Sequence, residues 1–140
     1  MKKLLLITSF LSSQLFAAQC TEKQYEPYFV INSDRYIYTS SSKVGNNVFD
    51  KKSVAYDKEN QTIRVWLITQ VSDNYKPAIL KTLWELDIKN NRARGLSDMQ
   101  LDCNGMITNS EVEEKWVYIG PNTALEAFSN SLKLYLNIKQ

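Results

Sequence analysis

The sequence predicts an α+β domain: an antiparallel sheet of about five or six strands with a C-terminal helix packed on one face. Three observations predict this class. Residues 62–69 and 79–88 are short runs rich in β-branched and aromatic residues, which favours strands over helices. Residues 79–88 also alternate between apolar and charged positions, as a half-buried antiparallel strand does. Near the end of the chain, apolar residues recur at helical spacing instead.

The start of the 140-residue chain has the pattern of a Sec export signal. Lys2 and Lys3 form a basic start, residues 4–16 are mostly apolar, and two alanines at 17–18 supply small residues before a cut. We therefore expect residues 1–18 to be a signal peptide. An anchor that is never cleaved is the alternative, because a bulky phenylalanine stands third before the cut.

After cleavage, residues 19–140 are expected to form a single domain in the periplasm or on the outer cell surface of a bacterium. The formal net charge of +2 falls to zero when Lys2 and Lys3 are removed, so nucleic acid is a poor partner. No later apolar run is long enough to span a bilayer, and we expect no stable membrane span after cleavage.

The chain has two cysteines, Cys20 and Cys103, and no histidine. Because an exported protein meets an oxidising environment, we expect these cysteines to form a disulfide, with two unrelated thiols as the alternative. Gln19 stands where a lipoprotein signal needs a small residue, so lipidation of Cys20 is not expected. Two cysteines without histidine cannot form the usual zinc sites, and imidazole-dependent catalysis is excluded. We expect no metal, no cofactor and no enzyme activity.

The expected strands, in chain order, cover residues 35–39, 48–56, 62–69, 79–88, 92–96 continuing at 99–103, and 106–108. Residues 25–31 could add an edge strand, because Pro27 cannot donate to a ladder. Gly95 suggests a bend or a bulge in the strand that begins at residue 92. Asn104 and Gly105 are typical of a two-residue hairpin turn, since both tolerate positive φ.

The two strands at the centre of the predicted sheet differ in how many of their faces are apolar. Residues 62–69 are apolar on both sides, which indicates a central strand covered on both faces. Residues 79–88 place one set of side chains toward the core, namely Leu80, Thr82, Trp84, Leu86 and Ile88. We expect the opposite set to meet water: Lys81, Glu85 and Asp87.

The C-terminal helix is predicted to begin at a capping box formed by Thr123 and Glu126, in which each side chain accepts a hydrogen bond from the free backbone N–H of the other residue. Leu125, Phe128 and Leu132 then form one apolar face that should pack on the sheet. Beyond this face the residues alternate like a strand, so we expect the helix to end near residue 131.

Two groups of charged residues are candidate sites. Glu85 and Asp87, about 7 Å apart on one strand face, could form a carboxylate pair for glycoside hydrolysis. The neighbouring lysines favour a charged outer face instead. Lys89, Arg92 and Arg94 form the candidate ligand patch, which could bind acidic glycans or host protein. The alternative is that these three residues keep an exposed hairpin soluble.

Several segments stand in an order that resembles one protein family. They are an aromatic-Asp-x-x-Ser-aliphatic segment at 49–54, a strand ending in Val65 and Trp66, and the segments 81–87, 92–97 and 116–123. Together they span roughly residues 36–132 and resemble the bacterial surface-adhesin protein E-like domain family. Family members usually carry a cysteine after the second strand and another near the end of the last helix. Ile88 and Leu132 stand at these places here.

The resemblance implies a single surface-adhesin protein E-like domain at residues 19–140 with a non-catalytic function. It implies adhesion at the bacterial surface to host extracellular-matrix proteins such as laminin, vitronectin and plasminogen, and it allows a homodimer. The alternative is a periplasmic interaction or inhibitory module that binds another envelope protein. A shared fold does not carry function by itself, so both hypotheses stay open.

Overall fold

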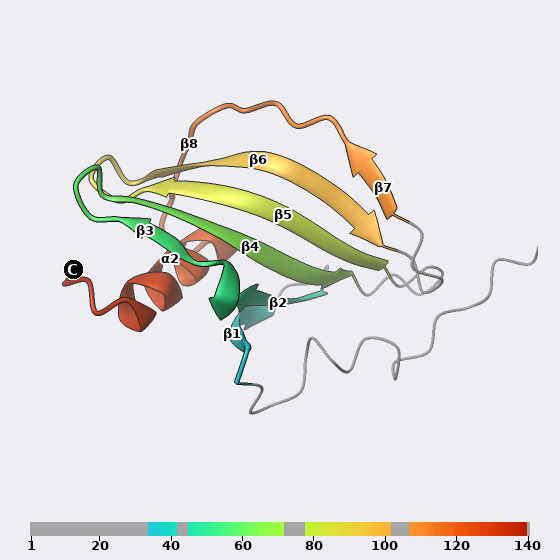
Figure 1. The fold of residues 1–140 in the computed structure, drawn as a ribbon, viewed down its shortest axis with the longest axis horizontal. Helices are drawn as coiled ribbons and strands as arrows, with labels where there is room; N and C mark the ends of the chain where they lie inside the picture. The colour runs from blue at the N-terminus through green and yellow to red at the C-terminus, as the bar shows by residue number, and fades with distance from the viewer. Residues whose placement is uncertain (1–33, 42–44, 72–77, 102–106, 140) are drawn as a thin grey trace, which may run out of the picture.

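A computed structural model describes residues 34–41, 45–71, 78–101 and 107–139 of the chain. These residues form one antiparallel sheet and one C-terminal α-helix, as Figure 1 shows. The elements in chain order are β1 (Tyr36–Ser41), β2 (Gly45–Asp50), the short 3-10 helix η2 (Lys51–Ser53), β3 (Ala55–Asp57), β4 (Thr62–Val71), β5 (Ala78–Asp87), β6 (Arg92–Leu101), β7 (Ile107–Ser110), β8 (Val117–Tyr118) and α2 (Ala124–Tyr135).

The sheet has eight strands in the described part of the chain, more than the five or six predicted. Six follow the order β1-β2-β4-β5-β6-β7, while the short strands β3 and β8 pair with β4 and β6. The predicted single strand at 48–56 is wrong, because η2 divides it into β2 and β3. Asp50 makes this break: its carboxylate accepts from the backbone N–H of Lys52, and its carbonyl accepts from the hydroxyl of Ser53.

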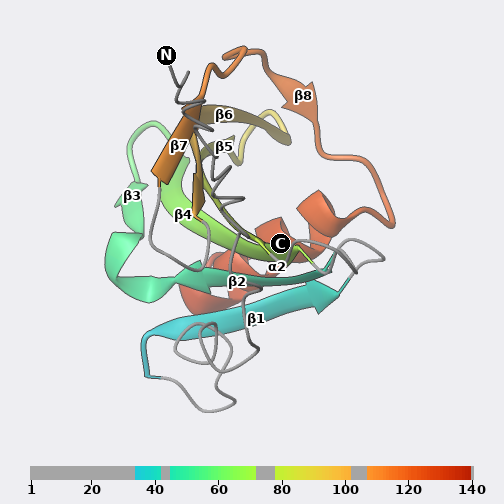
Figure 2. The same cartoon turned by 90° about the vertical axis from the view of Figure 1, so that its right-hand side faces the viewer.

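The sheet curves around α2, as the end-on view in Figure 2 shows. We call the face toward α2 the inner face and the opposite face the outer face. The inner core joins both layers and consists of Phe49, Ile63, Val65, Leu86, Ala93, Ile119, Phe128 and Leu132. Trp84 packs against this core, so the inner face of β5 is the one that the sequence predicted. Ile88 also packs against this core.

Of the bend or bulge predicted at Gly95, the structure has the bulge. Leu83 pairs with Ser97 and Trp84 pairs with Gly95, which leaves one extra residue on β6 between the two pairs. A side chain at Gly95 would bring a Cβ to 3.2 Å from Cγ1 of Val112, so the segment that follows β7 packs closely at this point. The bulge therefore lies where the coil leading to β8 approaches the sheet.

The helix begins as predicted but ends later. Oγ1 of Thr123 accepts from the backbone N–H of Glu126 at 3.1 Å, which confirms one bond of the predicted capping box. The return bond differs from the prediction, because the Glu126 carboxylate accepts from the backbone N–H of Asn122, at 2.7 Å, and not from that of Thr123. The predicted end near residue 131 is wrong, because α2 continues to Tyr135. The ring of Tyr135 packs edge-on against Phe49 at 5.8 Å, and this tertiary contact extends the helix by one turn. Asn137, with a φ of 54°, then ends the helix.

Several expectations lie outside the described residues: the signal peptide at 1–18, the edge strand at 25–31, the pairing of Cys20 with Cys103, and the Asn104-Gly105 turn. The strands on either side of that turn do pair, since Leu101 lies opposite Ile107 in the antiparallel ladder. Among the described residues, no helix combines the length and apolar character that a membrane crossing needs.

Candidate functional site

The outer face carries a connected group of charged and aromatic side chains near the turn between β5 and β6. The register of three neighbouring strands creates it, because Arg64 on β4 lies opposite Glu85 on β5, and Glu85 lies opposite Arg94 on β6. Directly opposed residues present their side chains on the same face of a sheet. We call this group the outer-face cluster: Arg64, Glu85, Asp87, Arg92, Arg94 and Trp116.

Glu85 is the centre of the cluster. Arg94 donates from Nε at 2.9 Å and from Nη2 at 2.7 Å to Oε1, while Nε of Arg64 donates to Oε2 at 2.6 Å. The Glu85 side chain is only 7% exposed as a result. Burial alone would raise the pKa of Glu85, but the hydrogen bonds from Arg64 and Arg94 outweigh it and hold the pKa below its ordinary value.

Asp87 forms the second ion pair, at the end of β5. Its Oδ2 accepts from Nε of Arg92 at 2.9 Å and from Nδ2 of Asn90 at 2.7 Å, and its Oδ1 accepts from the backbone N–H of Asn90. Burial would raise the pKa of Asp87, but the bonds from Asn90 and Arg92 lower it overall. The prediction that Glu85 and Asp87 meet water is wrong, because arginines of the neighbouring strands cover both carboxylates.

Trp116 lies in the coil before β8 and contacts an arginine of each ion pair. The guanidinium carbon of Arg92 lies 4.5 Å from the centre of the indole ring, and that of Arg94 lies 4.6 Å from it. Both distances are those of cation–π contacts. Tyr118 follows on the same face, because it pairs directly with Arg92 in the sheet. Its side chain is 70% exposed, so the aromatic surface continues outward from the cluster.

The structure brings together two of the three residues in the predicted ligand patch. Arg92 and Arg94 share the ring of Trp116, while Lys89 lies exposed in the turn between β5 and β6. Arg64 and Trp116 were not among the predicted site residues. Arg64 lies two strands away from Arg94, so only the sheet register connects them. The alternation of Trp116, Val117 and Tyr118 is a sequence signal for β8 that could have drawn attention to this segment.

The cluster contains arginine donor groups that its own ion pairs do not use. Arg64 and Arg92 are 60% and 43% exposed, and each uses only its Nε in the bonds described above. Their terminal Nη groups have no hydrogen-bond partner among the residues that the structure describes. Arginine, tryptophan and tyrosine are the side chains most often found at energetic hot spots of protein interfaces. Chemically, the cluster can receive carboxylate or carbonyl oxygens of a partner beside an aromatic contact.

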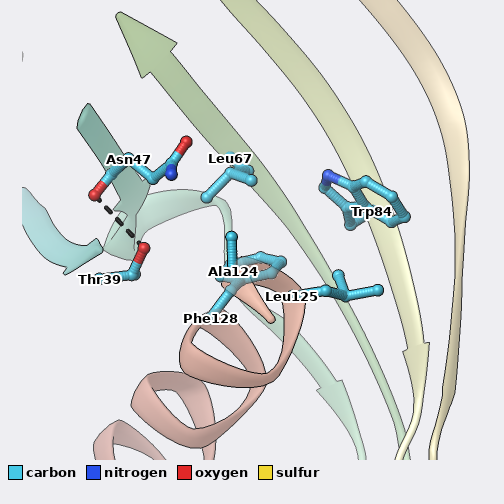
Figure 3. Close-up of a pocket in the computed structure, with 7 residues that line it drawn as sticks. All are labelled: Thr39, Asn47, Leu67, Trp84, Ala124, Leu125 and Phe128. Carbon is cyan, nitrogen blue, oxygen red and sulfur yellow. Dashed lines mark hydrogen bonds between the residues drawn. The ribbon is translucent and has the colours of Figure 1, made fainter. Parts of the chain in front are cut away.

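A second feature lies on the inner face, where a cavity of about 210 Å³ separates the sheet from the first turns of α2 (Figure 3). Its lining residues come from four strands and the helix: Thr39, Asn47, Leu67, Trp84, Ala124, Leu125 and Phe128. Nε1 of Trp84 is buried and has no hydrogen-bond partner in the described structure. In Figure 3 this nitrogen lies on the edge of the indole that faces Leu67.

The other polar side chains of the cavity already have partners. The Thr39 hydroxyl donates to the carbonyl of Asn47 at 3.3 Å. Oδ1 of Asn47 accepts from Thr69 at 2.7 Å, and its Nδ2 donates to Ser40 at 3.1 Å.

Within the described residues, no three side chains of the metal-binding types gather into a group that could hold an ion.

A comparison with protein-family models, with curated proteins and with solved structures gives no match for this chain. The resemblance to surface-adhesin protein E-like domains therefore rests on segments of the sequence alone.

Proposed function

We propose that the mature chain is an exported, non-catalytic binding protein that recognises a protein partner through the outer-face cluster and Tyr118. One observation carries the proposal: half-exposed arginines and an arginine-stacked tryptophan lie side by side on one sheet face. Such a surface can combine charge-assisted hydrogen bonds with aromatic contact area, and interface hot spots use this combination.

The geometry of the arginines favours binding in a second way. Each guanidinium is already held at Nε by a buried carboxylate, and two of them also rest on Trp116. Less side-chain freedom is therefore lost when a partner binds than would be lost by freely rotating arginines. The exposed Nη groups suit a partner that presents aspartate or glutamate side chains, because guanidinium and carboxylate match in geometry.

The sequence resemblance supports a role as a bacterial surface adhesin, with host matrix proteins as the first partners to test. The second candidate is a periplasmic module that binds another envelope protein through the same face. Both use the same surface chemistry, so cellular location separates them. Protease treatment of intact cells should degrade a surface adhesin, whereas a periplasmic protein should become sensitive only after the outer membrane is permeabilised.

Biolayer interferometry tests the adhesin proposal. Mature protein (residues 19–140) is passed over immobilised laminin, vitronectin and plasminogen, with serum albumin as a control surface. We expect saturable binding to at least one matrix protein, weakened at high salt because charged contacts contribute. Absence of binding to all three, together with protease resistance on intact cells, contradicts the adhesin role. A pull-down from envelope extract then tests the periplasmic candidate.

A further inference from the structure

We propose that the cavity between the inner face and α2 binds a small, neutral, mainly apolar molecule with one hydrogen-bond acceptor, which receives the Nε1–H of Trp84. This site lies on the opposite side of the sheet from the outer-face cluster. It is independent of the proposed function, and either can fail without the other.

The size of the cavity sets the size of the ligand. Its volume is about 210 Å³. A cavity of about 150 Å³ lined by apolar side chains is known to hold benzene. The present cavity therefore has room for a molecule somewhat larger than benzene. Leu67, Leu125 and Phe128 supply apolar walls for the body of such a molecule.

The polar groups of the lining determine how many hydrogen-bond acceptors the ligand should carry. The side chains of Thr39 and Asn47 already make the bonds described above, so among the described lining residues the indole nitrogen is the buried polar atom without any partner. A buried donor without a partner is rare in folded proteins and calls for a water or a ligand group. Because the nitrogen is closed to solvent, an acceptor reaches it when a flexible neighbour such as Leu67 or Leu125 turns aside.

The charges around the cavity favour a neutral ligand. No ionisable side chain is among its lining residues. Asp98 is an acidic group on the inner face: its carboxylate accepts from the hydroxyl of Thr82, two residues before Trp84 on β5. A carboxylate ligand would meet this charge with no cation in the lining to offset it. A ketone, amide or ester oxygen avoids that cost.

Nuclear magnetic resonance tests the site with a matched pair of probes, acetophenone and α-methylstyrene. The two molecules have nearly the same shape, but only acetophenone carries a carbonyl acceptor. The chain has three tryptophans, so ¹⁵N spectra contain three indole signals, which Trp66→Phe and Trp116→Phe assign by elimination. We expect acetophenone to shift the Trp84 indole proton downfield and to leave the other two nearly unchanged. We expect α-methylstyrene to produce no such downfield shift.

Trp84→Phe is the matched variant, because it keeps an aromatic ring and removes the donor. In each protein we measure the ratio of the dissociation constant of α-methylstyrene to that of acetophenone, and comparing this ratio between the two proteins cancels the difference in hydration of the probes. The ratio should be roughly three- to tenfold larger in the wild type than in Trp84→Phe. If Trp84→Phe fails to fold, the wild-type spectra decide alone. An unmoved Trp84 signal at saturating acetophenone, or an equal ratio in both proteins, overturns the proposal and leaves a bound water as the partner of Nε1.

Discussion

Arg94 donates two hydrogen bonds to a single oxygen of Glu85, its direct partner across β5 and β6. Glu85 is buried, although the same sheet face also carries the solvent-exposed Arg64. The pair of Glu85 and Arg94 therefore stabilises the sheet and also forms part of the outer-face cluster. The same contact that stabilises the sheet positions the guanidinium groups of the outer-face cluster. Under the proposed function, stability and binding are therefore coupled at this position.

Glu85→Ala should destabilise the protein by about 2 kcal/mol. Removing a buried carboxylate leaves Arg64 and Arg94 without their partner, and breaking a buried pair costs roughly 3–5 kcal/mol. Solvent reduces the loss here, because Arg64 is mostly exposed. Urea unfolding measures the effect. Glu59→Ala, in the exposed turn between β3 and β4, is the control and should change stability by no more than about 0.5 kcal/mol. Equal midpoints for the two variants contradict the buried role of Glu85.

Stability should fall as the solution becomes acidic. Glu85 and Asp87 have folded-state pKa values below their ordinary values of 4.5 and 3.8. Below about pH 4.5 the unfolded chain takes up protons that the folded chain does not. The free energy of unfolding therefore decreases until the pH passes the folded-state pKa values, and these groups add no dependence near neutral pH. Urea midpoints between pH 3 and 7 measure this, and Glu85→Gln should show a shallower decline than the wild type.

Phe128→Ala should destabilise the protein by roughly 3–5 kcal/mol, the usual cost of removing a buried phenylalanine. Phe128 is 1% exposed and its ring lies 6.3 Å from that of Phe49 on β2, so it fixes α2 to the sheet. Leu134→Ala is the matched control on the same helix, because that side chain is 80% exposed. Thermal unfolding followed by circular dichroism compares them. Similar melting temperatures would mean that α2 packs on the sheet through another face.

Cys20 and Cys103 should be joined in protein recovered from the periplasm. The expectation rests on an even cysteine count and an oxidising destination. In the chain-entropy model, a loop of this size stabilises by up to roughly 4.7 kcal/mol. Non-reducing peptide mapping decides the question, and labelling of both cysteines as free thiols rules the bridge out.

Local patterns in the sequence were enough to predict the inner face. The alternation in residues 79–88 identified Trp84 and Leu86 as core-facing, and Thr123 with Glu126 marked the start of α2. These features depend on neighbours along the chain. The end of α2 could not be found in this way, because it depends on the contact between Tyr135 and Phe49, which are far apart in sequence.

The outer-face cluster was predicted only in part for the same physical reason. Charged residues on one side of a strand usually indicate a solvated face, and Glu85 and Asp87 were interpreted accordingly. Their burial requires arginines from β4 and β6, and so depends on strand register. The Trp84 donor was also hidden, because a missing hydrogen-bond partner can be recognised only when the whole surrounding is known.

Two double variants test the central claim, recognition through the outer face, most directly. Arg64→Ala with Tyr118→Ala removes one cation and one exposed apolar side chain from that face. Lys139→Ala with Leu134→Ala removes the same kinds of group from the C-terminal segment. Their affinities for the bound matrix protein are measured by interferometry, after urea unfolding has shown that both fold. The account predicts at least tenfold weaker binding, about 1.4 kcal/mol, for the first variant and wild-type affinity for the second. Equal affinities for the two variants would contradict it.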